Sequence, residues 1–425
     1  MALYMAKNDG TLWDVAVIGG GPAGMMAAGR AAELGAKVVL IEKNEMLGQK
    51  LLITGGGRSN VTNAEFDTRT LLSKFKGNGK FLFSTFSEFS VKETLDFFHS
   101  RHMPTKIEAE KRVFPLSNSA QSVWDTLVEY LKQGKVTVLS KSPVSGFIKK
   151  EKNIQAVRLR NGKEIRALTF ILATGGTSRP ETGSTGDGFR WLKEIGHAIA
   201  EPKASLVPIA TKNSWVKRIA GVSLPNVKIS LFQNNVKQGE RIGKILFTHF
   251  GVSGPTILNM SRDVGELLQY GDVTIMLDLM PKLDHGELNA KLQELFTVHA
   301  NKKFKNSLGE LVPSSLASVI VELSGIDPDL FCNKVSREKR LHLLKLLKNL
   351  PLEVKNLLGT DKAIVTSGGV LLHEVDFKTM QSRLFQNLYL IGDILNIDRP
   401  SGGYSLQLCW TTGFVAGTHA ASLKK

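Results

Sequence analysis

The stretch that most constrains the fold runs from Asp14 to Lys43 and reads DVAVIGGGPAGMMAAGRAAELGAKVVLIEK. Its residues Val15 to Ile18 have the composition of a buried strand. Gly19, Gly21 and Gly24 follow at GxGxxG spacing, and an alanine-rich, helix-forming segment comes directly after them. Strand, glycine turn and helix in this order are the context in which that spacing binds a dinucleotide. The stretch therefore predicts a Rossmann-type unit in an α/β fold.

The three glycines of this motif have different tasks. The first lets the chain turn tightly, the second lets the backbone approach a pyrophosphate, and the third lets the helix lie close to the sheet. The first helical amides, near Pro22 and Ala23, then face the phosphates. Lys37–Ile41 is predicted to be a second strand, and it ends at Glu42, where an acid accepts hydrogen bonds from ribose hydroxyls and disfavours a 2'-phosphate.

A second glycine-rich stretch, Gly48–Asn63, reads GQKLLITGGGRSNVTN and is too polar to be a core element. Three consecutive glycines precede Arg58, Ser59 and Asn60, so backbone can press against a flat ligand with hydroxyl and amide groups at its edge. The alternative is a mobile surface turn.

The end of the chain returns to the predicted nucleotide site. Phe170–Ala173 is predicted to be a strand that runs into Gly175, and Leu388–Ile391 a strand that ends at Gly392 and Asp393. Ser401–Tyr404 opens a final helix, which places further helix-start amides beside a ligand. A site built from both ends of the chain fits FAD better than NAD, because FAD is long. With a single GxGxxG, a separate Rossmann domain for NAD(P)H is not visible, so NAD(P)H is kept only as a transient electron donor.

The length of 425 residues exceeds the size at which single cores stop growing. After a turn-rich loop over 177–190 and a helix expected to begin at Trp191, the character of the sequence changes beyond Pro202. We predict a split FAD-binding domain of the two-dinucleotide-binding-domain flavoprotein type, made of residues 1–202 and 359–425. The insert, 203–358, is expected to be β-rich over 203–280 and helical over 281–358.

The net charge of +16 is unevenly distributed. Lys and Arg minus Asp and Glu give +8 for residues 1–202, +7 for 203–360 and +1 for 361–425. Such a surface attracts polyanions such as RNA, or is simply a solvated basic surface. The basic clusters are Lys74, Lys76 and Lys80; Lys149, Lys150, Lys152, Arg158 and Arg160; Lys302, Lys303 and Lys305; and Arg337, Lys339, Arg340, Lys345 and Lys348.

Two cysteines, Cys332 and Cys409, lie far apart, with no CxxC pair and no cluster at metal-ligand spacing, so no metal is expected. The start of the chain lacks the apolar region of a signal peptide, and no run of 18 apolar residues occurs. We expect a soluble, cytoplasmic protein that uses no membrane.

Eight motifs together resemble a known family, and they occur in its order: GGGPAG, GQKLLITGGGRSNVTN, RVFP, ATGGTSRPETGSTGDGF, ASLVP, LFTHFGVSGP, VTSGGV and GDILNIDRPSGGYSLQ. The chain resembles the bacterial flavoproteins named after aminoacetone oxidase, which are related to bile-acid ene reductases and to a 23S ribosomal RNA dihydrouridine synthase. The resemblance implies an insert that covers the flavin face. It also implies FAD held by Gly19, Gly21, Ala23, Gly24, Glu42, Lys43, Lys50, Gly57, Asn60, Val144, Ala173, Gly175, Asp393, Gly403 and Tyr404, to which the strand end adds Gly392.

The sequence departs from the family at four positions, Ser59, Asp393, Asn396 and Ser405, where cysteine, glutamate, aspartate and asparagine are common. At the first of these a hydroxyl can still donate a hydrogen bond but is a poor acid. Two further candidate catalytic residues each have a structural role as the alternative. His249 donates a proton at the flavin or orders its loop, and Tyr404 donates to the substrate or packs against the ring.

Three classes of function follow. In the first, an FAD-dependent oxidoreductase reduces a carbon–carbon double bond by hydride transfer, with uridine in 23S ribosomal RNA favoured as substrate by the basic clusters. The second is an oxidase that takes hydride from a small amine and makes hydrogen peroxide. The third is a flavin-binding protein that senses redox state without turnover. Ribosomal RNA is the expected partner in the first class and a small molecule in the second.

Overall fold

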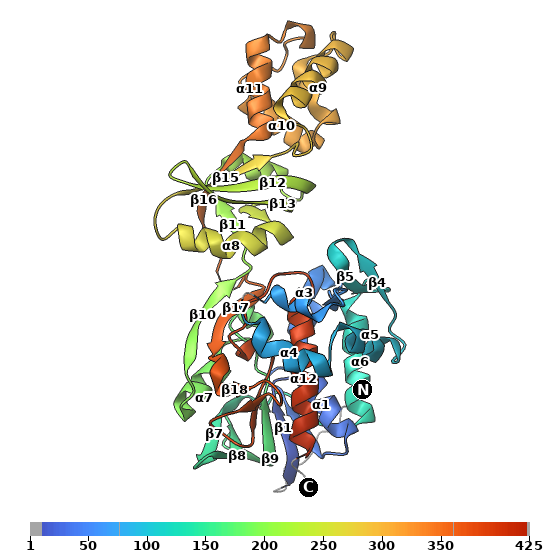
Figure 1. The fold of residues 1–425 in the computed structure, drawn as a ribbon, viewed down its shortest axis with the longest axis vertical. Helices are drawn as coiled ribbons and strands as arrows, with labels where there is room; N and C mark the ends of the chain where they lie inside the picture. The colour runs from blue at the N-terminus through green and yellow to red at the C-terminus, as the bar shows by residue number, and fades with distance from the viewer. Residues whose placement is uncertain (1–10, 76, 360, 423–425) are drawn as a thin grey trace. The chain divides into compact units, whose positions relative to one another are not determined.

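The computed structural model describes residues 11–75, 77–359 and 361–422 (Figure 1). The described chain forms two compact units. One is Ser205–Lys362, and the other contains the segments before and after it. Each unit has its own cluster of buried hydrophobic residues, and the two clusters share no residue. We call the unit formed by the segments before Ser205 and after Lys362 the larger unit, and we call Ser205–Lys362 the inserted unit.

The larger unit is built on a sheet that has nine strands among the described residues, in the order β18-β19-β20-β9-β1-β2-β6, with β7 and β8 joined to it through β9. From β20 to β6 the neighbouring strands run parallel. The central strand is fully buried over its last four residues, as expected for a parallel strand covered on both faces. The strands are β1 (Leu12–Ile18), β2 (Val38–Ile41), β6 (Thr137–Leu139), β7 (Val144–Lys150), β8 (Asn153–Leu159), β9 (Glu164–Leu172), β18 (Val375–Asp376), β19 (Gln381–Ser382) and β20 (Leu388–Leu390).

Two helices from opposite ends of the chain, α1 (Pro22–Glu33) and α12 (Tyr404–Ser422), lie side by side against this sheet (Figure 1). Their approach depends on glycine. A Cβ at Gly413 would lie 2.6 Å from the carbonyl oxygen of Ala23, and one at Gly417 would lie 2.5 Å from that of Ala27. The close packing brings the C-terminal helix beside the glycine motif.

The other helices of the larger unit are α2 (Gln49–Leu52), α3 (Thr68–Ser73), α4 (Gly79–Glu88), α5 (Val91–His99), α6 (Ala120–Gln133) and α7 (Asp187–Ile195). Short 3-10 turns include η1 (Thr54–Gly57), η8 (Leu372–Glu374) and η9 (Gly392–Ile394). Two smaller sheets complete the unit. One contains β3 (Thr62–Asn63), β5 (Arg112–Pro115) and β4 (Thr105–Glu108), and the other contains β10 (Ile199–Ser205) and β17 (Val365–Val370).

The inserted unit contains a closed barrel of order β11-β14-β13-β12-β15-β16. Its strands are β11 (Ile209–Thr211), β12 (Ser223–Gln233), β13 (Val236–Thr248), β14 (Gly251–Ser253), β15 (Val273–Asp278) and β16 (Leu350–Leu357). Helix α8 (Pro255–Leu267) packs on β13, and the helices α9 (His285–Val298), α10 (Ser314–Leu323) and α11 (Arg337–Lys348) form a second part. No helix of the described chain is long and apolar enough to cross a membrane.

Three sequence predictions about elements were wrong in detail. The helix expected to begin at Trp191 begins at Asp187 and ends at Ile195, because Gly196 follows in the left-handed conformation with φ of 113°. The stretch Gly48–Asn63 contains a helical turn whose Leu51 is completely buried, so it does contribute to the core. The segment 281–358, expected to be helical, ends in β16, which pairs with β15 and closes the barrel.

Candidate functional site

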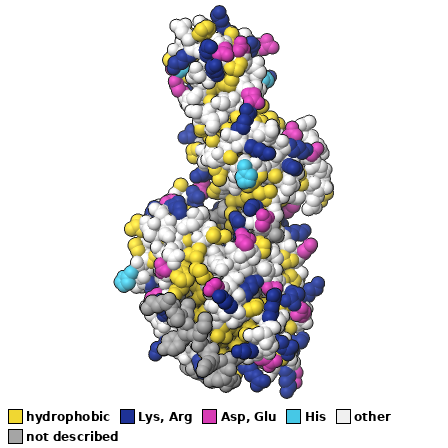
Figure 2. All heavy atoms as spheres, turned by 180° about the vertical axis from the view of Figure 1, so that it is seen from behind, with side chains coloured by type: hydrophobic (Ala, Val, Ile, Leu, Met, Phe, Trp, Pro, Cys, Tyr) yellow, Lys and Arg dark blue, Asp and Glu magenta, His cyan; other side chains and the backbone are white. Residues whose placement is uncertain are grey.

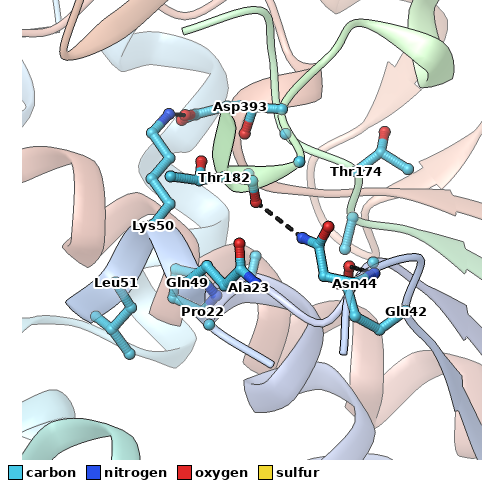
Figure 3. Close-up of a pocket in the computed structure, with 18 of the residues that line it drawn as sticks. Pro22, Ala23, Glu42, Asn44, Gln49, Lys50, Leu51, Thr174, Thr182 and Asp393 are labelled. Atoms are coloured by element: carbon cyan, nitrogen blue, oxygen red, sulfur yellow. Dashed lines mark hydrogen bonds and ion pairs between the residues drawn. The ribbon is translucent and has the colours of Figure 1, made fainter. Parts of the chain in front are cut away.

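The larger unit contains a long cleft whose empty space, counted together with the open solvent at its mouth, is about 1220 Å³ (Figure 3). Its walls come from the glycine turn and α1, from the ends of β2 and β9, and from η9 and α12 near the C-terminus. The carboxyl ends of parallel strands are where open α/β sheets bind their ligands. The cleft is therefore the candidate site.

The glycine turn forms the centre of the cleft. A Cβ at Gly24 would lie 1.9 Å from the carbonyl oxygen of Gly19, so only glycine lets the helix approach the turn this closely. At Gly21 a Cβ would meet no atom within 4 Å, and the cleft lies open there. No side chain caps the start of α1, and Pro22 occupies its first turn. No capping side chain of the described residues therefore competes with an anionic group for the helix-start amides near Ala23.

Glu42 lies at one end of the cleft, directly after β2. Its Oε2 accepts a hydrogen bond from the Gly20 amide at 2.7 Å, and its Oε1 accepts one from the Asn44 amide at 2.8 Å. Burial raises the pKa of this carboxyl, while the two amides favour its charged form. The carboxylate therefore holds the glycine turn and the following loop in place, and its remaining lone pairs can accept from ribose hydroxyls.

The loop after β9 closes the same end. The Asn44 side-chain amide donates to the carbonyl oxygen of Thr182 at 3.0 Å (Figure 3). The Lys43 ammonium donates to the Thr185 hydroxyl at 2.6 Å and pairs with Asp187 at 3.1 Å. These contacts hold the loop beside β2, although 142 positions separate Lys43 from Thr185.

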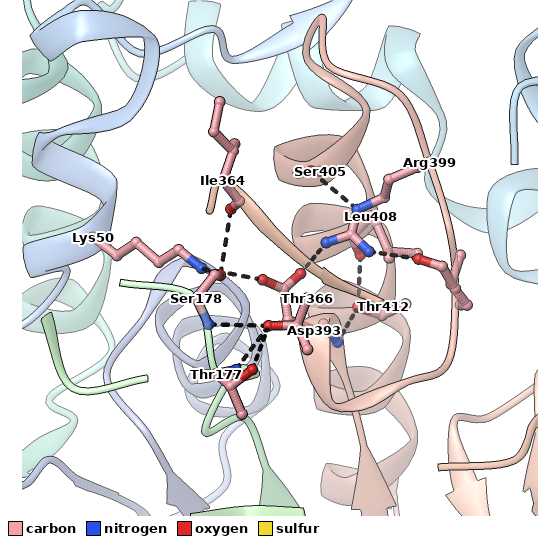
Figure 4. Close-up of polar contacts among 12 residues, drawn as sticks. Lys50, Thr177, Ser178, Ile364, Thr366, Asp393, Arg399, Ser405, Leu408 and Thr412 are labelled. Atoms are coloured by element: carbon pink, nitrogen blue, oxygen red, sulfur yellow. Dashed lines mark hydrogen bonds and ion pairs between the residues drawn. The ribbon is translucent and has the colours of Figure 1, made fainter. Parts of the chain in front are cut away.

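At the other end of the cleft, a buried charge network surrounds Asp393 (Figure 4). The side chain of Arg399 is fully buried, and it pairs with Asp393, donates to the Ser405 hydroxyl at 3.0 Å and donates to the Ile397 carbonyl oxygen at 2.7 Å. Lys50 approaches the second Asp393 oxygen at 3.5 Å. Burial alone would raise the pKa of Asp393, but the charges of Arg399 and Lys50 reverse that effect and lower it. With two cations around one carboxylate, this end carries one excess positive charge.

The network continues to the strand β17. The Lys50 ammonium also donates to the Ser178 hydroxyl at 2.7 Å. The Thr366 hydroxyl in turn accepts from the backbone amides of Thr177 at 2.7 Å and Ser178 at 3.1 Å (Figure 4). Lys50 is therefore held by groups from both ends of the chain.

The residues present fit FAD. The uncapped helix start suits a pyrophosphate, Glu42 suits a ribose, and the excess positive charge near Asp393 suits a ring that becomes more negative on reduction. The Thr174 hydroxyl, on the cleft wall, is buried and has no hydrogen-bond partner among the described residues. The cleft is lined by eleven of the residues predicted to bind the cofactor: Gly19, Gly21, Ala23, Glu42, Lys43, Lys50, Val144, Ala173, Gly175, Gly392 and Asp393.

Five predicted cofactor residues do not line the cleft. Gly24 supports the turn from behind, as described above, and Gly57 is exposed in η1. With the Asn60 side chain oriented so that its oxygen and nitrogen both have partners, the oxygen accepts a hydrogen bond from the Gly403 backbone amide at 2.9 Å. Tyr404 packs edge-on against another ring, at 6.0 Å between centroids. Asn60, Gly403 and Tyr404 therefore lie around the start of α12, and the role of all five residues toward the cofactor stays a prediction.

The three candidates for the chemistry are not brought together in one unit. Ser59 is completely buried, and its hydroxyl has no partner among the described residues. Burial and the charge of Glu65 raise the pKa of Tyr404. His249 lies in the inserted unit, exposed in the turn after β13, with its ring 4.8 Å from that of Phe250. All three roles stay predictions.

Two buried residues, Cys409 and Arg399, lie close to Asp393. Cys409 belongs to the hydrophobic core and also lines the cleft, and burial raises its pKa to about 12, so it stays a neutral thiol. The role of Arg399 is not predicted from the sequence. The acids that precede it in GDILNIDRPSGGY are the available signal, because buried arginine is rare unless it is paired.

The predicted basic clusters are partly neutralised. Lys303 and Lys305 both pair with Asp329 at 2.8 Å, which lowers the pKa of that carboxyl to about 2. Arg340 donates to the Asn289 side chain at 3.0 Å. Lys76 lies outside the described residues. On the face seen in Figure 2, Lys and Arg side chains are interspersed with Asp and Glu. The formal charge of a cluster therefore overstates its attraction for an anion.

The comparisons with known proteins cover nearly the whole chain. A family model described as the HI0933-like protein Rossmann domain matches residues 13–419. The 3-dehydro-bile acid delta(4,6)-reductase of Clostridium scindens is 29% identical over 415 residues, which cover 96% of this chain and 98% of the relative. The ribosomal RNA dihydrouridine synthase of Escherichia coli is 28% identical over 415 residues, which cover 97% of this chain and 99% of the relative.

Among solved structures, the 3-ketosteroid delta1-dehydrogenase of Sterolibacterium denitrificans superimposes with a TM-score of 0.54 at 14% identity. The match covers 97% of this chain and all of the other. This likeness concerns the fold.

Proposed function

Because the chain belongs to the HI0933-like family of FAD-dependent oxidoreductases, we propose that it reduces the C5–C6 double bond of a uridine in ribosomal RNA. The observation that carries the proposal is the full-length similarity to two relatives whose names describe related chemistry. In a 3-ketone with 4,6-unsaturation and in uracil alike, the double bond is conjugated to a carbonyl group. Hydride adds to the β-carbon of the double bond, and a proton adds to the α-carbon, which is bonded to the carbonyl group.

FAD, when bound, supplies the hydride of this reaction. The helix-start amides near Ala23 and the Glu42 carboxylate hold the nucleotide part in place. The cations Lys50 and Arg399 keep Asp393 ionised, and their excess charge favours the reduced, more negative ring. Tyr404, the first residue of α12, is our candidate to deliver the proton.

The choice of RNA over a steroid rests on charge. A net charge of +16 attracts a polyanion much more strongly than a molecule with one carboxylate or a cationic amine. Ion pairs within the basic clusters, such as those of Lys303 and Lys305, lower the effective positive charge there, but the net charge of the chain stays positive.

The test is mass spectrometry of nucleosides from ribosomal RNA of cells with and without the gene. We expect one uridine to gain two hydrogens only when the protein is present, and the Glu42→Arg variant to fail to restore it. The purified protein, reduced by NADH or NADPH, should regain its oxidised flavin spectrum when unmodified ribosomal RNA is added. Unchanged uridines in both strains would overturn the proposal, and hydrogen peroxide production from amines would then favour the oxidase.

A second candidate function is reduction of an unsaturated 3-ketosteroid, favoured by the 29% identity with the bile acid reductase. Reoxidation of the reduced flavoprotein by a 3-keto-4,6-diene steroid, but not by RNA, would select it.

A further inference from the structure

The larger unit has a second cleft, separate from the cofactor cleft, between the start of α4 and the segment from η8 to β19. Its empty space, counted together with the open solvent at its mouth, is about 530 Å³. Leu372, Val375 and Phe377 are buried and form an apolar floor. The Phe377 ring lies 5.8 Å from that of Phe81, measured between centroids, and the carbonyl oxygen of Phe377 accepts from the Thr85 hydroxyl at 2.6 Å. The two walls are thus fastened to each other.

The rim of this cleft is positively charged. Lys80, Lys378 and Arg383 line it, and none of the three forms an ion pair with a residue that the structure describes. Asp376 is the acid among the lining residues, and its Oδ1 accepts from the Lys378 backbone amide at 3.0 Å. The rim therefore has an excess of two positive charges. This differs from Lys303 and Lys305, which share Asp329.

Unpaired lysine and arginine around a small cavity are the arrangement that binds a phosphate group. The apolar floor favours a phosphate that carries an organic group, such as the sugar of a nucleotide, over a free ion. We propose that this cleft binds a phosphodiester group of a single-stranded RNA segment. The inference rests on the proposed RNA substrate and adds a contact site for it within the larger unit.

The experiment measures binding of a fluorescently labelled oligouridylate to the FAD-loaded protein at several salt concentrations. The variant carries Lys80→Gln, Lys378→Gln and Arg383→Gln. A matched control carries Lys92→Gln, Lys135→Gln and Lys163→Gln, which removes the same charge from exposed lysines that also form no ion pair with a described residue. We expect the cleft variant to bind roughly tenfold more weakly. The slope of log affinity against log salt should become shallower by about 0.7 for each phosphate that the variant no longer neutralises.

Equal weakening in both variants would mean a general charge effect and would overturn the proposal, as would unchanged affinity in the cleft variant. Competition by inorganic phosphate at constant ionic strength distinguishes the sources of the phosphate group. Displacement of RNA by phosphate at low concentration would show a free-ion site and reject the RNA assignment. Because binding is measured directly, the result does not depend on whether uridine is reduced. Flavin absorbance of each variant verifies that the fold and cofactor are intact.

Discussion

At the scale of single residues, Glu42 has the most demanding position, because each carboxylate oxygen already accepts a backbone amide. In Glu42→Gln one oxygen becomes an NH₂ group that faces an amide donor. The lost bond and the unsatisfied donor cost about 1–3 kcal/mol, so FAD affinity should fall by about 5- to 150-fold. Titration of the apoprotein with FAD, followed by flavin fluorescence, measures the change.

The matched control is Glu45→Gln in the same loop, where the acid is exposed and pairs with Lys141. We expect its FAD affinity to stay within about twofold of the original, since exposed ion pairs contribute little. Normal FAD affinity in Glu42→Gln would show that the carboxylate is dispensable for the site.

At the scale of elements, His197 joins three segments of the larger unit. It follows α7, its Nδ1 lies 2.6 Å from Glu374 of η8, and its Nε2 lies 3.0 Å from the hydroxyl of Ser382 in β19. That hydroxyl accepts from the amides of Leu384 and Phe385, so its own proton is directed to the imidazole. The arrangement suits a neutral ring that donates from Nδ1 and accepts at Nε2.

Burial lowers the pKa of His197, although Glu374 acts in the opposite direction. As pH falls through about 6.5, the unfolded chain takes up a proton that the folded chain does not, so stability is lost. His197→Asn keeps a donor toward Glu374 but does not titrate. We expect the stability advantage of the original protein over this variant to shrink by up to about 1.4 kcal/mol per pH unit below that point.

Calorimetry of both proteins between neutral pH and pH about 5 tests this expectation. His99→Asn, a variant of an exposed histidine, is measured in parallel as the control. If the advantage over His197→Asn grows on acidification, the ring is protonated in the folded state.

Elements with a strong local signal were predictable, and those set by context were not. The Rossmann-type fold and FAD binding, predicted from strand, glycine turn, helix and terminal acid, are confirmed. The strand β13 was missed because its first half, VKQGERIGK, is polar, and pairing with β12 holds it extended. The helix α7 begins at Asp187, inside a glycine-rich loop whose composition favours turns. The burial of Arg399 is not predicted, because Asp393 and Ser405, each a few positions away, reach it only through the path of the loop.

At the scale of the whole molecule, the inserted unit joins the larger one at two adjacent points. The Leu371 amide donates to the Ala198 carbonyl oxygen, and Gly368 lies against Glu201. From the first contact to the second, the residue number rises along β10 and falls along β17, so the two strands run antiparallel. Ser205, at the end of β10, therefore lies opposite the start of β17. Replacing residues 206–362 with a short Gly-Ser linker should therefore leave a folded, yellow protein.

The reason is that the two units have separate hydrophobic cores. Flavin absorbance per protein, measured after gel filtration, should match that of the full chain within about a factor of two. An insoluble or colourless product, with the full chain prepared in parallel as control, would show that the larger unit depends on the insert.

The split of the larger unit also sets the order in which a growing chain can fold. Residues 11–204 leave the ribosome without β20, which pairs with β9, and without α12, which packs on α1. The inserted unit, complete by residue 362, can fold while the earlier segment still waits for its partners. Asp393 and the start of α12 close the cleft only when synthesis is almost finished. Flavin uptake thus marks full-length chains, and products that stop short of α12 leave the ribosome without a complete site.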